Sequence, residues 1–171
     1  MQAIFDLVRD VPDFPRPGIM FKDITPMLGD GRAFAACVDL LAEAIAPRKP
    51  EALVGIESRG FIFGAPVADR LGTGFAPVRK PGKLPSTCIR ESYALEYGTD
   101  TLEIHEDAVK PGQRVLIVDD LLATGGSARA TSALVKKLGG TVHGLAFLIE
   151  LVALNGRSRL TGENVHASLQ Y

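Results

Sequence analysis

The chain has 171 residues, and its 19 lysines and arginines nearly balance 20 acidic residues, for a formal net charge of -1. This length suits one domain with a substantial core, and the balanced charge argues against a general nucleic-acid-binding protein. Two cysteines form no disulfide framework, and the N-terminus lacks the pattern of a signal peptide. The longest apolar segment, residues 145–154, is too short to span a membrane. We therefore expect a cytoplasmic protein that binds neither nucleic acid nor membranes.

The N-terminal quarter predicts three segments. Residues 1–10 pattern as a short helix, and three prolines between residues 12 and 17 predict an extended segment after it. The apolar residues 19–21 follow, and periodicity alone assigns them to the core. Residues 32–45 show the apolar stripe of an amphipathic helix, which we interpret as scaffold. Cys37 lies in this helix and fits a small buried hydrophobic residue.

A buried strand is predicted over residues 52–56, and polar residues follow where this strand must end. Ligands of open α/β sheets bind at the carboxyl ends of the strands, so Arg59 is a candidate anion-binding residue. A surface salt bridge is the commoner fate of an arginine and stays open as the alternative. Residues 64–71 are predicted to form a helix.

Three cations follow the next predicted strand, residues 75–78. They are Arg79, Lys80 and Lys83. In a chain with almost no net charge, this local excess at a strand end is placed to receive a polyanion. The alternative is a solvated charged face, which is the usual meaning of a charge run.

The stretch from Leu84 to Glu106 contains two strand-like runs around a turn-forming cluster, residues 97–100. Leu102 and Ile104 alternate with polar residues, which is typical of a strand with one buried face. We predict a β-hairpin, about residues 82–106, that projects from the sheet.

The most informative stretch, residues 114–127, reads RVLIVDDLLATGGS. Residues 115–118 are apolar without alternation, which predicts a central strand buried on both faces of a parallel sheet. Asp119 and Asp120 stand where this strand reaches its carboxyl end. The residues after them are small and let the backbone point several N–H groups into one concavity: Ala123, Thr124, Gly125, Gly126 and Ser127. A helix is predicted from Ser127 onward, so a phosphate in this loop would also face the positive end of a helix dipole.

The two acids restrict the ligand of this loop, because carboxylates repel a phosphate unless they bind something beside it. Ribose hydroxyls are donors and ionised carboxylates are acceptors, so the stretch predicts a ribose 5-phosphate ligand. The alternative is a strand whose terminal acids merely cap a turn. Competing phosphate motifs are missing from the sequence: GxxxxGK[ST] does not occur, and Gly72 and Gly74 lack the third glycine of a dinucleotide fingerprint.

The remaining elements complete an α/β fold, with a mainly parallel central sheet and helices on both faces. Residues 142–149 are predicted as another strand and residues 166–171 as an edge strand. Leu151 follows the first of these strands and fits an ordinary core leucine. The three histidines show no metal-ligand spacing.

DDLLATGG resembles the phosphoribosyl pyrophosphate signature of the type I phosphoribosyltransferases, and LLATGG resembles their adenine branch. Four further stretches carry the resemblance in the family's order: FPRPGIMFKDITPML, ESRGFIFGAPVA, PVRKPGKLP and YALEYGTDTLEIH. The resemblance implies one domain over residues 1–171, with a small N-terminal hood, about residues 1–30, and a flexible hairpin. It also implies transfer of the 5-phosphoribosyl group of phosphoribosyl pyrophosphate to adenine, giving AMP and diphosphate. The implied cofactor is Mg2+, held mainly by substrate and water, and the implied assembly is a homodimer.

The resemblance assigns adenine to four positions. Phe21 and Leu151 correspond to the two walls of the family's adenine pocket, and Met20 to the residue whose backbone meets the ring edge. Lys22 is a departure, since arginine is common there.

The resemblance assigns diphosphate to a second group of residues: Ser58, Arg59, Arg79, Lys80 and Lys83. Among them, Arg59 is also implied to act in catalysis. A non-proline cis peptide between Glu57 and Ser58 is common in the family, and we predict one here.

Glu96 and Tyr97 correspond to flap residues of the family. Glu96 is the carboxylate that we expect to act as general acid or base for the imidazole proton of the purine. The 6-oxopurine relatives carry an acid in the phosphate loop, where this chain has Ala123. A solvated hairpin glutamate is the alternative for Glu96.

Two other functions fit the same signature. One is a phosphoribosyltransferase that uses hypoxanthine, guanine or xanthine instead of adenine. The other is a non-catalytic sensor of phosphoribosyl pyrophosphate, which would need an effector module that the sequence does not show.

Overall fold

The computed structural model describes residue 4, residues 6–94 and residues 98–171. Its internal contacts divide the chain into two compact units, Met1–Leu40 and Leu41–Tyr171, and each is described by itself. The expected hood lies within the first unit.

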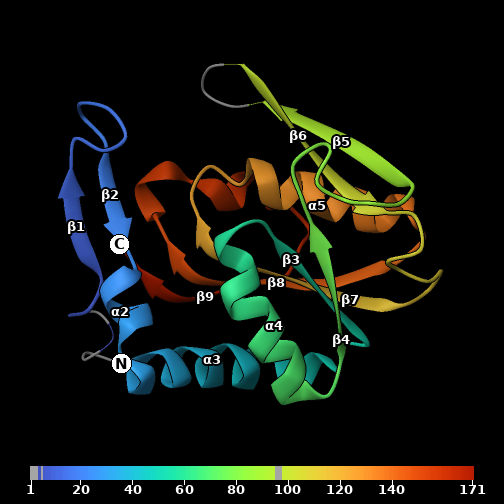
Figure 1. The fold of residues 1–171 in the computed structure, drawn as a ribbon, viewed down its shortest axis with the longest axis horizontal. Helices are drawn as coiled ribbons and strands as arrows, with labels where there is room; N and C mark the ends of the chain where they lie inside the picture. The colour runs from blue at the N-terminus through green and yellow to red at the C-terminus, as the bar shows by residue number, and fades with distance from the viewer. Residues whose placement is uncertain (1–3, 5, 95–97) are drawn as a thin grey trace. The chain divides into compact units, whose positions relative to one another are not determined.

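The first unit contains a small antiparallel sheet that the sequence did not predict. Strand β1, Arg9–Pro12, pairs with strand β2, Met20–Asp23 (Figure 1). The expected helix over residues 1–10 is therefore wrong from residue 6 onward, because residues 6–8 form a turn and a bend and the backbone of Arg9 and Asp10 pairs with β2. The connecting loop turns at Gly18, whose φ of 84° suits glycine and whose N–H donates to Asp13 Oδ1 at 2.8 Å.

Two helices follow this sheet, α2 over Thr25–Gly29 and α3 over Gly31–Ile45. The Asp30 carboxylate accepts hydrogen bonds from two N–H groups in the first turn of α3, each at 2.9 Å, and so satisfies donors that the helix leaves unpaired. Val38 and Cys37 are buried, as the predicted stripe and the predicted role of the cysteine require.

The second unit is built on a sheet of five strands, all parallel, in the order β4-β3-β7-β8-β9 (Figure 1). The strands are β3 Ala52–Ile56, β4 Gly74–Val78, β7 Arg114–Leu122, β8 Thr141–Glu150 and β9 Val165–Gln170. β7 occupies the centre, and its residues 115–118 are completely buried. The predicted central strand and the predicted C-terminal edge strand are both confirmed.

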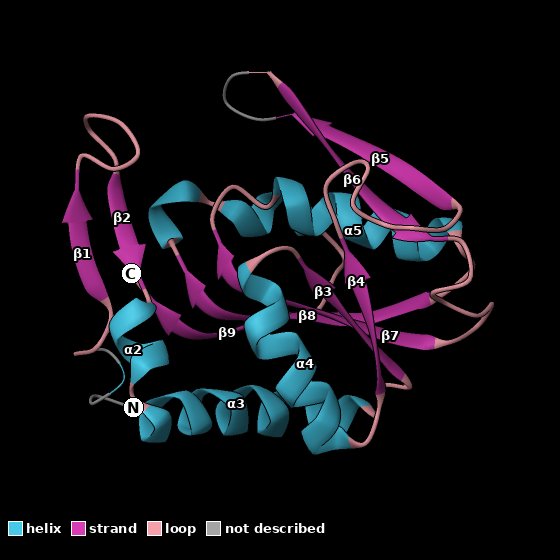
Figure 2. Cartoon of the chain, in the orientation of Figure 1, coloured by secondary structure: helices cyan, strands magenta, loops and turns pink. Residues whose placement is uncertain are grey.

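Helices α4, Arg59–Leu71, and α5, Gly126–Lys137, cover the sheet (Figure 2). Leu134 of α5 packs in one cluster with Ile117, whereas α4 packs on β7 beside Val118 through Gly60, which is outside that cluster. Because neighbouring residues of a strand point to opposite faces, the two helices lie on opposite sides of the sheet.

Helix α4 begins five residues before the predicted helix. Its first turns were not predicted because they contain Gly60, Gly64 and Pro66, which have low helix propensity. The structure explains the glycines, since a Cβ atom at Gly60 would lie 2.7 Å from Asp119 Oδ1 and one at Gly64 would lie 2.7 Å from the Phe75 ring.

The predicted hairpin is present as β5, Cys88–Ala94, and β6, Thr99–His105, in antiparallel register. Leu102 and Ile104 are buried in the same core as α5, so the inner face of the hairpin is part of the core. Backbone hydrogen bonds of 2.9 and 2.7 Å also join Arg79 to Glu103 of β6. The hairpin is thereby fixed to the segment that follows β4.

The described residues of the second unit also contain three 3-10 helices: η1 Ala46–Arg48, η2 Val152–Leu154 and η3 Gly156–Leu160. In the described part of the chain, every helix is too short or too polar to cross a membrane.

Candidate active site

Polar residues from several elements line a pocket of about 300 Å³ at the carboxyl ends of β3 and β7. The predicted residues that reach this pocket are Ser58, Arg59, Lys80, Asp119, Asp120 and Ser127. They come from three separate stretches of sequence, and the order of the strands brings them together.

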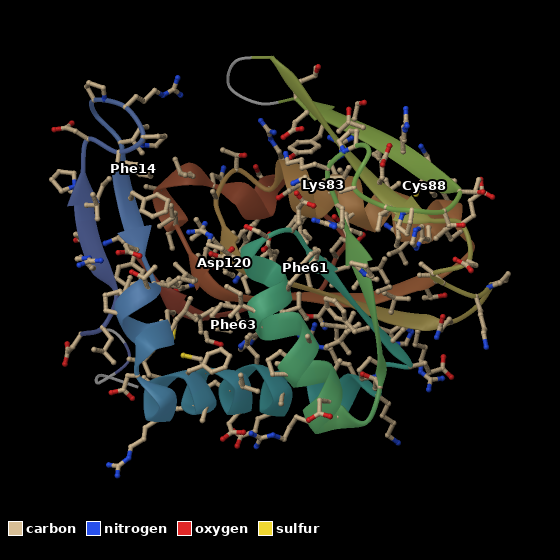
Figure 3. The ribbon with its side chains drawn as sticks, viewed as in Figure 1. Phe14, Phe61, Phe63, Lys83, Cys88 and Asp120 are labelled. Atoms are coloured by element: carbon tan, nitrogen blue, oxygen red, sulfur yellow. The ribbon has the colours of Figure 1, made fainter. Side chains whose placement is uncertain are left out.

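Asp119 and Asp120 form the acidic side of the pocket. Both are buried, with 8% and 5% of their surface exposed, and Asp120 Oδ2 lies 2.9 Å from Arg59 Nε. Figure 3 shows Asp120 near the start of α4. Burial raises the pKa of Asp119, and the adjacent charge of Asp120 raises it further. Burial also raises the pKa of Asp120, although the Arg59 guanidinium opposes this effect. Hydroxyl donors that enter the pocket would therefore stabilise carboxylates whose ionised form is costly.

The cations after β4 are held by a buried carboxylate. Glu57 accepts a hydrogen bond of 2.8 Å from Arg79 Nε and one of 2.6 Å from Lys83 Nζ. Burial opposes ionisation of Glu57, but the hydrogen bonds from Lys83 and Arg79 hold its pKa below the ordinary value. The peptide bond between Glu57 and Ser58 is cis, which confirms that prediction. A single acid thus gathers two of the predicted diphosphate-binding cations.

Lys80 joins the cation segment to the hairpin. Its Nζ forms an ion pair with Asp100 of β6 and lies 5.9 Å from the centroid of the Tyr93 ring. Tyr93 donates a hydrogen bond to the same carboxylate at 3.2 Å. Burial lowers the pKa of Lys80, although the nearby Glu57 charge opposes the effect. An anion in the pocket would therefore compete with Asp100 for this ammonium.

Sequence reasoning missed Glu57 and Tyr93 as site residues. Tyr93 lines the pocket, and Glu57 both lines it and holds two cations. Glu57 lies in ESRGFIFGAPVA and Tyr93 lies in YALEYGTDTLEIH, two of the stretches that carry the family resemblance. Their position in these stretches was the signal that could have identified them as site residues.

The predicted phosphate loop forms a second hollow of about 140 Å³, lined by residues 121–128 and Tyr93. Gly125 precedes α5 with a φ of 79°, a conformation that glycine adopts without strain. The first N–H groups of a helix have no partner within it and carry the positive end of its dipole. All five predicted loop residues, 123–127, line this hollow, which has the geometry to hold a phosphate group.

A turn from farther along the chain supports this loop. A Cβ atom at Gly156 would lie 2.2 Å from the Ala123 carbonyl oxygen, and one at Gly125 would lie 2.5 Å from the Gly156 carbonyl oxygen. Leu151 donates its N–H to the Leu122 carbonyl at 2.9 Å, so the predicted base-contacting leucine lies beside the loop.

The other predicted adenine residues belong to the first unit. Met20 is 50% exposed, and the Phe21 ring meets Phe14 edge to face at 5.1 Å. Lys22 forms an ion pair of 2.5 Å with Asp10. The proposed catalytic residue Glu96 and its neighbour Tyr97 lie outside the described residues.

The site contains donors suited to Mg2+. In the ranges that the structure describes, no three His, Cys, Asp or Glu side chains gather as a ready-made metal site. The carboxylate oxygens of Asp119 and Asp120 are nevertheless the hard ligands that Mg2+ prefers, and they lie beside the phosphate loop. These residues fit an ion that takes most of its ligands from a phosphorylated substrate and water.

Comparison with known proteins gives consistent matches along the chain. The phosphoribosyl transferase domain family matches residues 26–162. The adenine phosphoribosyltransferase of Desulfitobacterium hafniense is 56% identical over 164 residues, which cover 96% of this chain and 95% of that protein. The crystal structure of adenine phosphoribosyltransferase from Thermoanaerobacter pseudethanolicus is 53% identical, with a TM-score of 0.98 and 99% of both chains covered. The enzyme from Saccharomyces cerevisiae, complexed with an imino-altritol bisphosphate and adenine, is 42% identical, with a TM-score of 0.90 and coverage of 96% and 95%.

Proposed function

The chain belongs to the phosphoribosyl transferase family, and from this membership we infer that it transfers the 5-phosphoribosyl group of phosphoribosyl pyrophosphate to adenine. The products are AMP and diphosphate, and the reaction belongs to purine salvage. The observation that carries this conclusion is identity of 53% or more, over almost the full length, with several adenine phosphoribosyltransferases. The pocket supports it, because a phosphate loop lies beside two buried carboxylates.

The donor binds along the carboxyl edge of the sheet. Its 5-phosphate occupies the loop of residues 123–127, and its ribose hydroxyls donate to Asp119 and Asp120. Its diphosphate binds the cations around Glu57: Arg59, Arg79, Lys80 and Lys83. Since each of these cations already pairs with a carboxylate, the diphosphate exchanges one anionic partner for another.

Transfer begins when a ring nitrogen of adenine attacks the anomeric carbon of the ribose. The bond from this carbon to the diphosphate oxygen breaks, and the electron pair leaves with the diphosphate. Positive charge develops on the ribose and negative charge on the leaving group. Asp119 and Asp120 stabilise the positive charge on the ribose, and Arg59 and its neighbouring cations stabilise the negative charge on the diphosphate. Bound Mg2+ would add further charge stabilisation at the diphosphate and ribose oxygens.

The assignments for the base remain proposals from the family resemblance. Met20, Phe21, Lys22 and Leu151 are assigned to adenine. Glu96 is assigned to the imidazole proton, with Tyr97 beside it in a flap that shields the reaction from water.

The decisive experiment measures diphosphate release by the purified protein with Mg2+ and phosphoribosyl pyrophosphate. Adenine, hypoxanthine, guanine and xanthine are offered separately. We expect release with adenine alone. Release with an oxopurine instead would retain the loop assignment and reject the base assignment. Donor binding without release for any base would favour a sensor.

The role of Glu96 has its own test. Glu96→Gln is expected to lower kcat by roughly 100- to 10,000-fold with a small effect on the KM for the donor. Glu106→Gln, at an exposed position just after β6, is the matched control. Full turnover in Glu96→Gln would reject the assignment.

A homodimer and a cytoplasmic location are further predictions, supported by the family resemblance and by the cysteine content. Light scattering of the purified protein measures its mass in solution and so tests the homodimer. A monomeric mass with full activity would contradict it.

A further inference from the structure

A half-buried ion pair, with a buried carboxylate and a partly exposed guanidinium, lies next to the site without belonging to it. Glu150 ends β8 with only 4% of its surface exposed, and both of its carboxylate oxygens accept hydrogen bonds from Arg157 of η3, at 2.7 and 2.8 Å. Gln170 of β9 donates to the same carboxylate at 3.1 Å. Arg157 also donates to the Val165 carbonyl at 2.9 Å. The pair therefore joins the end of β8, the turn after it and both ends of β9.

The chemistry of this pair favours one fixed arrangement. Two parallel hydrogen bonds between a guanidinium and a carboxylate fix distance and orientation together. The hydrogen bond from Arg157 lowers the pKa of Glu150, although burial opposes this, and the same bond raises the pKa of Arg157. Removing one partner would leave the other charge partly buried and unpaired.

The pair closes the segment of residues 151–156, which contacts the last residue of β7 at its start and the phosphate loop at its end. At its start, the Leu151 N–H donates to the Leu122 carbonyl at 2.9 Å. At its end, the Gly156 backbone lies so close to Ala123 that a Cβ atom there would be 2.2 Å from the Ala123 carbonyl oxygen. Any displacement of residues 151–156 would therefore disturb the backbone contacts that support the phosphate loop.

Local structure gives this segment little rigidity of its own. It contains η2, a single short 3-10 helix, and Asn155, which adopts a left-handed conformation with a φ of 51°. Short 3-10 helices have poor hydrogen-bond geometry, and a left-handed residue other than glycine is strained. Contacts from outside the segment therefore hold it: the Val152 N–H donates to the Tyr171 carbonyl at 2.9 Å, and the Glu150–Arg157 pair joins the two residues that flank it.

We propose that Glu150 and Arg157 are positioning residues that hold residues 151–156 against the phosphate loop and so set its affinity for the donor's 5-phosphate. Neither residue lines the two pockets of the proposed donor site. This inference rests on the proposed function, because it assigns a supporting role to residues behind the proposed donor site.

The test compares Arg157→Ala and Arg157→Lys with Arg48→Ala as control. Arg48 is suitable because it also donates to the backbone and side chain of one residue, Asn164, at 3.1 and 3.0 Å, and Asn164 lies outside residues 150–157. The readouts are kcat, the KM for phosphoribosyl pyrophosphate, and the calorimetric affinity for ribose 5-phosphate, which needs no turnover.

We expect Arg157→Ala to weaken ribose 5-phosphate binding and raise the donor KM by about tenfold, with a smaller change in kcat. Arg157→Lys should show an intermediate effect, because one ammonium cannot reproduce the forked contacts. Millimolar guanidinium should restore binding to Arg157→Ala, whose missing group is partly exposed, whereas equal sodium chloride should not. Arg48→Ala should keep wild-type binding.

The inference is overturned if folded Arg157→Lys or Arg157→Ala binds ribose 5-phosphate as the wild type does, or if Arg48→Ala shows the same loss. A purely structural role would lower stability in both arginine variants without a selective effect on the donor KM. If Arg157→Ala does not fold, Arg157→Lys decides. Wild-type protein that neither binds ribose 5-phosphate nor turns over would instead refute the proposed function itself.

Discussion

Replacing Gly60 by alanine tests whether the start of α4 fixes the Asp119 carboxylate. The new Cβ would lie 2.7 Å from Asp119 Oδ1 and 3.0 Å from the Val118 carbonyl oxygen. Neither atom can move without cost, because the carbonyl belongs to the central strand and the carboxylate is buried. The helix or the carboxylate must therefore shift by several tenths of an ångström.

The size of the effect follows from this contact. Overpacking in a close-packed core costs typically about 1–3 kcal/mol, more than the propensity gain of about 1 kcal/mol for replacing a helical glycine by alanine. Misplacement of a binding group by about 1 Å can cost about 100-fold, so a smaller shift of Asp119 should raise the donor KM by about tenfold. Urea unfolding and steady-state kinetics measure the two quantities.

Gly64→Ala is the matched control, four residues later in α4. Its Cβ would lie 2.7 Å from the Phe75 ring, a partly buried side chain that does not line the pocket. We expect little change in donor KM for this variant. The reasoning is refuted if folded Gly60→Ala keeps a donor KM within about twofold of wild type, or if both variants raise it equally.

Three further results are expected. Asp119→Asn should weaken donor binding yet raise the melting temperature by a few degrees, and this gain should grow as pH rises. The reason is that burial and the Asp120 charge raise the pKa of Asp119 and make its ionised form costly in the folded state. An unchanged melting temperature at all pH values would contradict this. Glu57→Gln should lower the free energy of unfolding by about 1 kcal/mol at neutral pH. Because the pKa of Glu57 is lowered in the folded state, this loss of stability should disappear as pH falls below the ordinary glutamate pKa of 4.5. Burial raises the pKa of Cys37 to about 11, so Cys37 should resist a thiol reagent until the protein unfolds, while the less buried Cys88 reacts in the native state. Equal reaction rates of the two thiols in the native protein would contradict this prediction.

The sheet was predictable because each parallel strand buried on both faces leaves a continuous apolar run. Strand β3 has the predicted bounds, and the central strand was placed correctly from residues 115–118. The β1–β2 pair was missed because β1 contains Arg9, Asp10 and Pro12, which leave no alternation to detect.

The candidate site was predictable where its residues are neighbours in sequence. Asp119, Asp120 and the phosphate loop form one continuous motif, so their chemistry could be interpreted together. Glu57 and Tyr93 acquire their roles only when the strand order places them beside residues from other stretches. That information resides in the topology, which no local pattern expresses.

The parallel order of the sheet also determines when during folding the donor can bind. Every pairing in this sheet joins distant residues, as when β3 pairs Ala52 with Val115, and such non-local contacts form slowly. The donor site needs several of these pairings at once, so only the nearly complete fold can bind. Donor at 100 times its Kd would then stabilise the native state by about 2.7 kcal/mol. In a cell with little donor, a larger fraction of newly made chains would be exposed to proteolysis before they bind ligand.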